Sequence, residues 1–264
     1  MVDQFLVELS AAWAIAKKDL KIYYARPGTI MFGIMFPLFM FLSFAVGRNI
    51  PVTVALPGLV SMVVMFSSSS IGPFSIPLER RLKTFDRLLV APISFYTILV
   101  GKVMAGALYG IATGFIPIII GVLVFNAFIM HPEVLIPGLV ISAVCFASMG
   151  VMFASFPTEN PGNVTIALNF VRLPMIFVSG IFTSLEYPLL LAAIISPLTY
   201  ANDLMRMAFG RESYVEPLLD WLGLAVFTLI FLAVGTKLHS KFMGWEERPR
   251  SMRGMKRFRR ERPR

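Results

Sequence analysis

The chain has few charged residues, one cysteine and little that could bind a metal. Charged side chains make up 15% of its 264 residues, whereas soluble domains average about 25%. The single Cys145 excludes a disulfide within the chain. His131 and Glu133 are close in the sequence, but a metal site needs more ligands than these. We therefore predict neither a disulfide framework nor a metal site.

A phosphate-binding loop is also missing from the sequence. No G-x-x-x-x-G-K-[ST] motif occurs in the chain, and P-loop ATPases use this motif to hold nucleotide phosphates. The chain is therefore not expected to be the nucleotide-binding subunit of anything, to be an enzyme, or to bind a cofactor itself.

Apolar residues are abundant instead. They make up 57% of the sequence, which includes 24 phenylalanines and 16 methionines. This composition is typical of an integral membrane protein, and each spanning helix takes about 20 residues. The predicted fold is an all-α polytopic membrane protein with six transmembrane helices. They cover residues 29–47, 53–77, 96–125, 135–156, 163–182 and 219–238.

The positive charges indicate how these helices are oriented. Most of the 24 lysines and arginines lie before the first span, between the second and third, or after the sixth. Cytoplasmic segments carry such an excess, so both termini are predicted to be cytoplasmic in a cell-membrane protein. Segment 184–210 then lies on the outer side. Its apolar part is too short to cross a bilayer, which favours a re-entrant element.

Two flanking segments are predicted to contact the membrane surface. Residues 1–28 contain an apolar stripe at three- and four-residue spacing with lysines beside it, which is typical of an amphipathic interface helix. A helix packed on the rest of the protein is the alternative. Residues 240–264 form a basic tail. It directly follows a span, so we expect it to contact anionic lipids rather than nucleic acid.

A charged stretch, ERRLKTFDRLLVAPIS at residues 79–94, interrupts the apolar sequence. Its apolar residues recur at helical spacing, Glu79 and Lys83 form a favourable i,i+4 pair, and Pro92 ends the pattern. We predict a short amphipathic helix over 79–92, held between two spans at the cytoplasmic face. A solvated loop that only obeys the charge rule is the alternative.

This stretch, followed by Gly101–Lys102, resembles the signature between the second and third spans of ABC-2 type transporter permeases. A second block, LPMIFVSGIFTSLEYPLLLAAIISPLTYANDLMR, resembles the C-terminal block of the same family. Within that block, the motif residues expected to have a structural role are Pro174, Gly180, Pro197 and Tyr200.

The resemblance implies a half-size permease of the daunorubicin-resistance type. Such a subunit forms a homodimer and pairs with a separate ABC ATP-binding subunit, which holds ATP and Mg. In the family, the 79–92 segment is the coupling helix that docks on the ATPase. The coupling residues that this resemblance implies are Glu79, Arg80, Arg81, Lys83, Phe85, Arg87 and Leu89.

Arg172 is the most unusual residue within a predicted span. A charge near the bilayer centre costs about 2.5–3.5 kcal/mol on insertion scales unless it faces a partner or water. Asn169, Arg172 and Ser179 fall along one side of the fifth span, so that side is predicted to face the protein interior. It forms either part of a translocation pathway or a structural pairing.

The predicted function is ATP-driven export of a hydrophobic or amphipathic, drug-like small molecule, with ATP hydrolysis on the partner subunit. Export of a lipid or a lipid-linked glycan by the same architecture is one alternative. An ATPase-independent channel or scramblase is another.

Overall fold

The computed structural model describes residues 2–23, 27–48, 51–182, 185 and 189–246. These residues form helices and connecting turns and contain no strand, which confirms the predicted all-α class. The elements are α1 (Val2–Tyr23), α2 (Pro27–Ile30), the π-helical segment η1 (Met31–Met35), α3 (Phe36–Arg48), α4 (Val52–Ser68), α5 (Ile71–Arg81), α6 (Phe85–Leu89), α7 (Phe95–Phe125), α8 (Pro132–Phe153), α9 (Pro161–Val178), α10 (Leu189–Ala193), α11 (Pro197–Ala208) and α12 (Pro217–Glu246).

Within the described residues, five stretches are long and apolar enough to cross a membrane, where the sequence predicted six. They are Val54–Arg81, Phe95–Phe125, Pro132–Phe153, Pro161–Val178 and Pro217–Phe242, and they overlap the second to sixth predicted spans. The predicted first span, 29–47, is divided among α2, η1 and α3. The π-helical segment interrupts regular α-helical bonding there.

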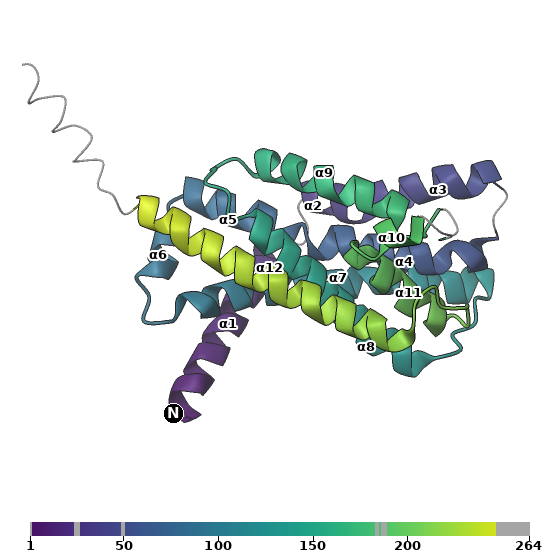
Figure 1. Ribbon diagram of the computed structural model, residues 1–264. Coiled ribbons are helices and arrows are strands. Elements are labelled where there is room, and N and C mark those ends of the chain that lie inside the picture. Colours follow the sequence, from purple (N-terminus) through teal and green to yellow (C-terminus); the bar gives the residue numbers. More distant parts are fainter. Residues whose placement is uncertain (1, 24–26, 49–50, 183–184, 186–188, 247–264) are drawn as a thin grey trace, which may run out of the picture.

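The long helices lie side by side in a bundle (Figure 1). One end of the bundle carries α6, and the opposite end carries α10 and α11; we call these the α6 end and the α11 end. Helix α12 crosses one face, α9 and α3 lie along one edge, and α1 projects from the opposite edge (Figure 1). Residues 184–210, predicted as re-entrant, contain α10 and α11 among the described residues. Both are too short to cross a bilayer.

Helix starts follow local capping chemistry. The Ser94 hydroxyl accepts a hydrogen bond from the Thr97 amide at 3.2 Å and begins α7. The Asn160 side chain accepts from the Gly162 amide at 2.9 Å, and Pro161 then occupies the first turn of α9. These side chains satisfy amide groups that have no partner within the helix, so each helix begins at a defined residue.

Helix α1 buries one face against α7 and leaves the other exposed. Ala12 and Ala16 are buried, and a Cβ on Gly101 of α7 would lie only 2.8 Å from the Ala12 carbonyl oxygen. Leu9 and Trp13, on the other face, are about half exposed. The chain therefore combines features of both sequence alternatives for this segment: a helix packed on the protein that also presents apolar side chains outward.

The second candidate span is broken at Ser69–Ser70, where α4 ends and α5 begins. Glycines from neighbouring helices allow close packing around the break. A Cβ on Gly110 of α7 would lie 1.7 Å from the Ser68 hydroxyl oxygen, and one on Gly150 of α8 would lie 2.4 Å from the Ser69 carbonyl oxygen. Small residues let helices approach this closely in membrane proteins. The break is therefore held in the centre of the bundle.

This packing predicts a large effect of Gly110→Val. The added side chain has no room beside Ser68, and overpacking of this kind costs about 1–3 kcal/mol. We expect a lower unfolding temperature in detergent and a smaller monodisperse fraction on size-exclusion chromatography. Ala112→Val, on the exposed side of the same helix, is the matched control and should leave both unchanged. Equal stability of the two variants would contradict the described packing.

Candidate functional site

The segment predicted as one coupling helix over 79–92 is divided in the structure. Helix α5 ends at Arg81, a turn follows, and the five-residue α6 begins at Phe85. Lys83 has a left-handed backbone with φ of 55°. The Thr84 amide donates to the Glu79 carbonyl at 2.9 Å and the Lys83 amide to the Arg80 carbonyl at 3.0 Å. This is a Schellman motif, in which the left-handed residue is usually glycine.

The coupling residues implied by the resemblance differ in burial and fall into three groups. Glu79, Arg80 and Phe85 are buried, with exposed fractions of 3%, 9% and 1%. Leu89 is half-buried. Arg81, Lys83 and Arg87 are exposed. The predicted Glu79–Lys83 pair does not form, because Glu79 faces the bundle interior and bonds to lysines of other helices.

Glu79 belongs to a buried charge cluster that joins three helices. The ammonium of Lys102, on α7, lies 2.7 Å from Glu79 Oε2 of α5 and 2.8 Å from Asp19 Oδ2 of α1. Lys18 ion-pairs with the same two carboxylates, at 3.0 Å from Asp19 Oδ1. Ser75 of α5 accepts a further bond from Lys102 at 3.4 Å.

The cluster is balanced in charge, and it reaches solvent through Lys18, whose side chain is 37% exposed. Lys102 and Asp19 are fully buried, and buried charges persist in proteins when they are paired and hydrogen-bonded. Burial opposes the charged form of Lys18, but the carboxylates of Asp19 and Glu79 outweigh this effect and raise its pKa above 10.5. Lys18 is therefore an ammonium group at physiological pH.

Sequence reasoning had not assigned a role to Asp19 or Lys102. The available signal was their setting: Lys102 lies inside an apolar run, and Asp19 follows two lysines on the amphipathic helix. Unpaired charges at such positions are costly, so they indicate partners, but the sequence does not say which residues these partners are.

Arg80 connects α5 to two other helices at the α6 end. Its Nη1 donates to the Phe156 carbonyl at 2.7 Å, just after α8. Its Nη2 lies 3.4 Å from Nδ1 of His239 on α12. The other ring nitrogen of His239 lies 3.1 Å from the Val151 carbonyl oxygen, so Nε2 carries the proton and Nδ1 accepts. Arg80 also stacks over Phe85, 5.7 Å from the ring centroid.

Arg172, on α9, bonds to the break in the second candidate span. Its Nη2 donates to the hydroxyl oxygens of Ser69 at 2.6 Å and of Ser70 at 3.4 Å. Its Nη1 donates to Asn169 Oδ1 at 3.2 Å, and the guanidinium lies 5.1 Å from the ring centroid of Phe66. Arg172 is fully buried. A guanidinium at mid-bilayer depth costs about 2.5–3.5 kcal/mol on insertion scales without such contacts.

Of the three polar residues predicted on one side of the fifth span, Asn169, Arg172 and Ser179, only the first two contact each other. Asn169 and Arg172 bond to each other, as stated above. Ser179 lies at the end of the helix, where its hydroxyl donates to the Ile176 carbonyl at 2.9 Å and its own carbonyl accepts from Asn202 at 3.3 Å. Ser179 therefore joins the contacts of the α11 end and not those of Arg172.

The motif residues of the C-terminal block organise the α11 end. Gly180 has a φ of 74°, which favours glycine, Pro197 starts α11, and Pro174 lies inside α9. The Tyr200 hydroxyl donates to the Ile194 carbonyl at 2.8 Å. Asp203 accepts from the Tyr214 and Val215 amides at 2.8–2.9 Å. These contacts fix the turns before and after α11.

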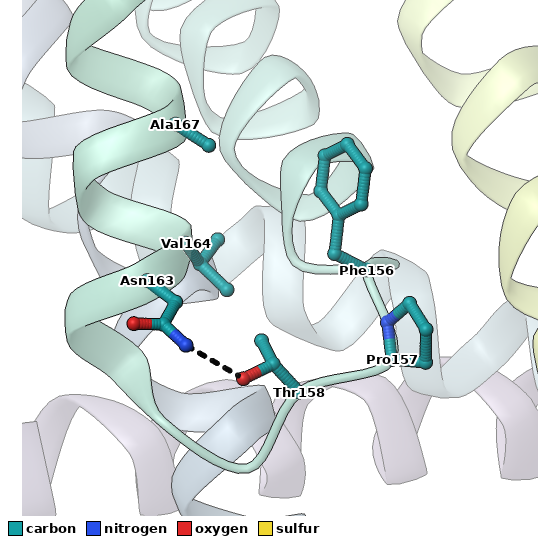
Figure 2. Close-up of a pocket in the computed structure, with 6 residues that line it drawn as sticks. All are labelled: Phe156, Pro157, Thr158, Asn163, Val164 and Ala167. Atoms are coloured by element: carbon teal, nitrogen blue, oxygen red, sulfur yellow. Dashed lines mark hydrogen bonds between the residues drawn. The ribbon is translucent and has the colours of Figure 1, made fainter.

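A small apolar pocket of about 300 Å³ lies at the α6 end between the end of α8 and the start of α9 (Figure 2). Figure 2 shows Phe156 and Val164 facing this space, and Asn163 bonded to Thr158 at its rim. The remaining lining residues are Pro157 and Ala167.

Comparison with known proteins agrees with this arrangement. The sequence profile of the ABC-2 type transporter family matches residues 10–210. The chain is also 28% identical over 155 residues to the inner membrane transport permease YadH of Escherichia coli K12 and to the protein of the same name from Shigella flexneri. Each alignment covers 58% of this chain and 59% of the relative, so less than two thirds of each relative's length is matched.

The apolar helices and these matches define a membrane transport protein. The chain belongs to the ABC-2 type transporter family, as a permease. The resemblance identified from the two sequence blocks is thereby confirmed.

The charge cluster predicts that Lys102→Met is strongly destabilising. The substitution leaves two buried carboxylates with Lys18 alone, and breaking a buried pair costs about 3–5 kcal/mol. We expect a large fall in unfolding temperature, partly restored by combining Lys102→Met with Asp19→Asn. Lys237→Met, which removes an exposed cation from α12, is the control. An unchanged unfolding temperature for Lys102→Met would show that the cluster does not support the fold.

Proposed function

We propose that this permease is the membrane subunit of an ATP-driven exporter that pairs with a separate ABC ATPase, which binds ATP and Mg. The supporting observation is the exposed tip at the α6 end. There, Leu82 and Val90 are 61% and 85% exposed among exposed charges. We define the coupling surface as Arg81, Leu82, Lys83, Asp86, Arg87 and Val90.

This surface suits a protein partner better than a solvated loop. Exposed apolar side chains framed by positive and negative charges are typical of a docking site, in which apolar contacts give affinity and charges give orientation. Glu79, Arg80 and Phe85, by contrast, are the buried base on which the coupling surface stands. Their proposed part in coupling is to transmit movement rather than to touch the ATPase.

The base connects the coupling surface to most of the bundle. The cluster of Lys102, Glu79 and Asp19 joins α5 to α7 and α1, and Arg80 joins α5 to the end of α8 and to α12. A force on the tip therefore reaches these helices through charged and buried contacts. The sequence has no phosphate loop, so the proposed energy source is a separate ATPase. Such a partner can act on the permease only through a surface connected in this way to the membrane helices.

The cargo that we propose is a hydrophobic or amphipathic small molecule. The pocket shown in Figure 2 is apolar and lies at the α6 end, and Asn169 and Arg172 lie further along the same helix, α9. We propose that α9 lines the path from this pocket and that two copies of the chain form a homodimer around the path. In support, Phe39 of α3 and Phe170 of α9 are 60% and 78% exposed, and the two helices that carry them lie along one edge of the bundle (Figure 1).

The membrane orientation is part of the same proposal: the α6 end and both termini face the cytoplasm of a cell-membrane protein. The basic tail, whose residues 247–264 lie outside the described part of the chain, is then close to the anionic inner leaflet. The exposed Leu9 and Trp13 of α1 suit a position in the membrane interface.

Two alternatives retain the fold but change the activity. A lipid or lipid-linked glycan would use the same coupling surface with a larger cargo. A channel or scramblase would work with no ATPase, and would leave the coupling surface without a function.

Co-purification tests the coupling surface. We expect the tagged permease to retain an ABC ATPase co-expressed from the same source, and Arg81→Glu with Arg87→Glu to reduce the retained ATPase at least about tenfold, as loss of about 1.4 kcal/mol implies. Lys241→Glu reverses an exposed charge on α12 outside the coupling surface and is the matched control.

The unfolding temperature of the permease alone distinguishes docking from misfolding. It should be unchanged in the Arg81→Glu, Arg87→Glu variant, since both residues are exposed. Full ATPase retention by this variant would refute the coupling surface. Transport by the permease alone in liposomes would favour the channel alternative.

Cysteine labelling tests the orientation. Cys145 is buried, so Cys145→Ala provides a cysteine-free background with little loss of packing. In that background, Lys83→Cys should react with a membrane-impermeant maleimide only after the inner face is opened. Glu133→Cys, at the opposite end of the bundle, should react in intact cells. The reverse pattern would overturn the orientation and, with it, docking of a cytoplasmic ATPase.

A further inference from the structure

Arg172 is a buried cation whose observed partners are all neutral. Its guanidinium bonds to two serine hydroxyls and one asparagine carbonyl and lies over a phenylalanine ring. Among the residues that the structure describes, no carboxylate forms an ion pair with it. The Nε donor is buried and makes no hydrogen bond within the described residues.

Lys102, another buried cation of the same chain, has charged partners. Lys102 is as deeply buried as Arg172, but two carboxylates lie within 2.8 Å of its ammonium. Lys102 is therefore neutralised where it stands, as expected for a structural charge. Arg172 has no carboxylate beside it among the described residues and retains an unused donor, in a setting where an unbalanced cation and an unbonded donor are both costly. A purely structural contact between α9 and the Ser69–Ser70 break would need neither a cation without a carboxylate partner nor an unbonded Nε.

We infer that Arg172 binds the anionic headgroup of the transported amphiphile, a carboxylate or phosphate attached to a hydrocarbon body. This inference rests on the proposed transport function and specifies the chemical class of its cargo. A planar guanidinium is suited to such a group, since it can donate paired N–H bonds to two oxygen atoms of one anion. The unused Nε supplies one of the donors needed.

The surroundings of Arg172 fit the rest of such a molecule. Ile166 and Phe170 on α9 are 60% and 78% exposed and give the outer side of this helix an apolar surface, while Arg172 faces the bundle interior. An amphiphile whose headgroup meets Arg172 when α9 moves can keep its hydrocarbon body on that outer side. A neutral or cationic amphiphile gains nothing from Arg172, and a cationic one is repelled by it.

The hydroxyls of Ser69 and Ser70 occupy Arg172 in the described conformation. Because Arg172 is fully buried, an anion reaches it only when α9 moves away from the break between α4 and α5. The two serines then act as replaceable acceptors that hold the guanidinium in the absence of cargo. Binding of the anion and separation of α9 from the break are accordingly the same event.

Photo-crosslinking tests this assignment on the full-length permease in phosphatidylcholine nanodiscs, alone and with its co-purified ATPase in each nucleotide state. The probes are a long-chain carboxylic acid and a quaternary ammonium compound with the same diazirine-bearing tail. Adducts are mapped by mass spectrometry. We expect the acid to label α9 and the Ser69–Ser70 region in at least one state, at least about tenfold more than the ammonium probe.

Substitutions at Arg172 separate charge from fold. Arg172→Gln should remove the preference for the acid, and Arg172→Lys should keep part of it, because lysine retains the charge but not the planar donor pair. Lys237→Gln, which removes an exposed cation elsewhere, should label as the unchanged protein does. If Arg172→Gln does not fold, the labelling ratio of the two probes on the unchanged protein and on Arg172→Lys still tests whether the preference for the acid depends on Arg172.

Adding an unlabelled competitor to the crosslinking reaction identifies the source of the anion. Protection by excess unlabelled fatty acid assigns the site to a small amphiphile, and protection by phosphatidylglycerol assigns it to a membrane lipid; both support the inference. Protection by inorganic phosphate alone, equal labelling by both probes, or unchanged labelling of Arg172→Gln overturns it.

This result is separable from the proposed function. Acid-selective labelling of a permease that retains no ATPase would refute the ATP-driven exporter while leaving the anion site intact. An assembled and ATP-hydrolysing complex without acid-selective labelling would refute only the anion site.

Discussion

The architecture of the α6 end depends on the ammonium of Lys102 between the carboxylates of Asp19 and Glu79. Each of these charges comes from a different helix, and a buried charge that loses its partner is destabilising. The positions of α1, α5 and α7 are therefore conditional on one another. The neighbouring Gly101 lets α1 approach closely enough for the contact to form. Adjacent residues of one sequence motif thus supply the space and the charge for the same contact.

The second candidate span consists of two helices, α4 and α5, that pack in different parts of the bundle. Its α5 part belongs to the charged network of the α6 end, while its α4 part packs in the centre of the bundle against glycines of α7. The parts meet at Ser69–Ser70, where the Ser70 amide donates to the Ser67 carbonyl, three residues back, at 3.2 Å, and Arg172 of α9 contacts that junction. In the proposed mechanism, a force on the tip moves α5 and reaches α9 through this junction.

The sequence predicts those features that one helix determines by itself. Hydropathy placed α7, α8 and α9 within a few residues and found the start of α12, which extends to Glu246, beyond the predicted end at residue 238. It did not predict the division of 79–92, because the left-handed residue of the turn is Lys83 and not the glycine that would have signalled it. Nor did it predict that Glu79, Arg80 and Phe85 point inward, since their burial comes from helices far away in the chain. The interruption of the first span by η1 left no signal in composition.

Under the proposed function and the proposed anion site, coupling and cargo selection share the serine junction, which links ATPase docking to cargo binding thermodynamically. The hydroxyls of Ser69 and Ser70 bond Arg172 only while α9 rests on the break. An anion that replaces them favours the conformation in which α9 and α5 have separated, and a partner that displaces α5 favours the same conformation. Two ligands that stabilise one conformation strengthen each other's binding by the same factor. In the proposed mechanism, cargo and ATPase are coupled through neutral hydroxyls that are weak enough to be replaced, a role for which the carboxylates around Lys102 are unsuited.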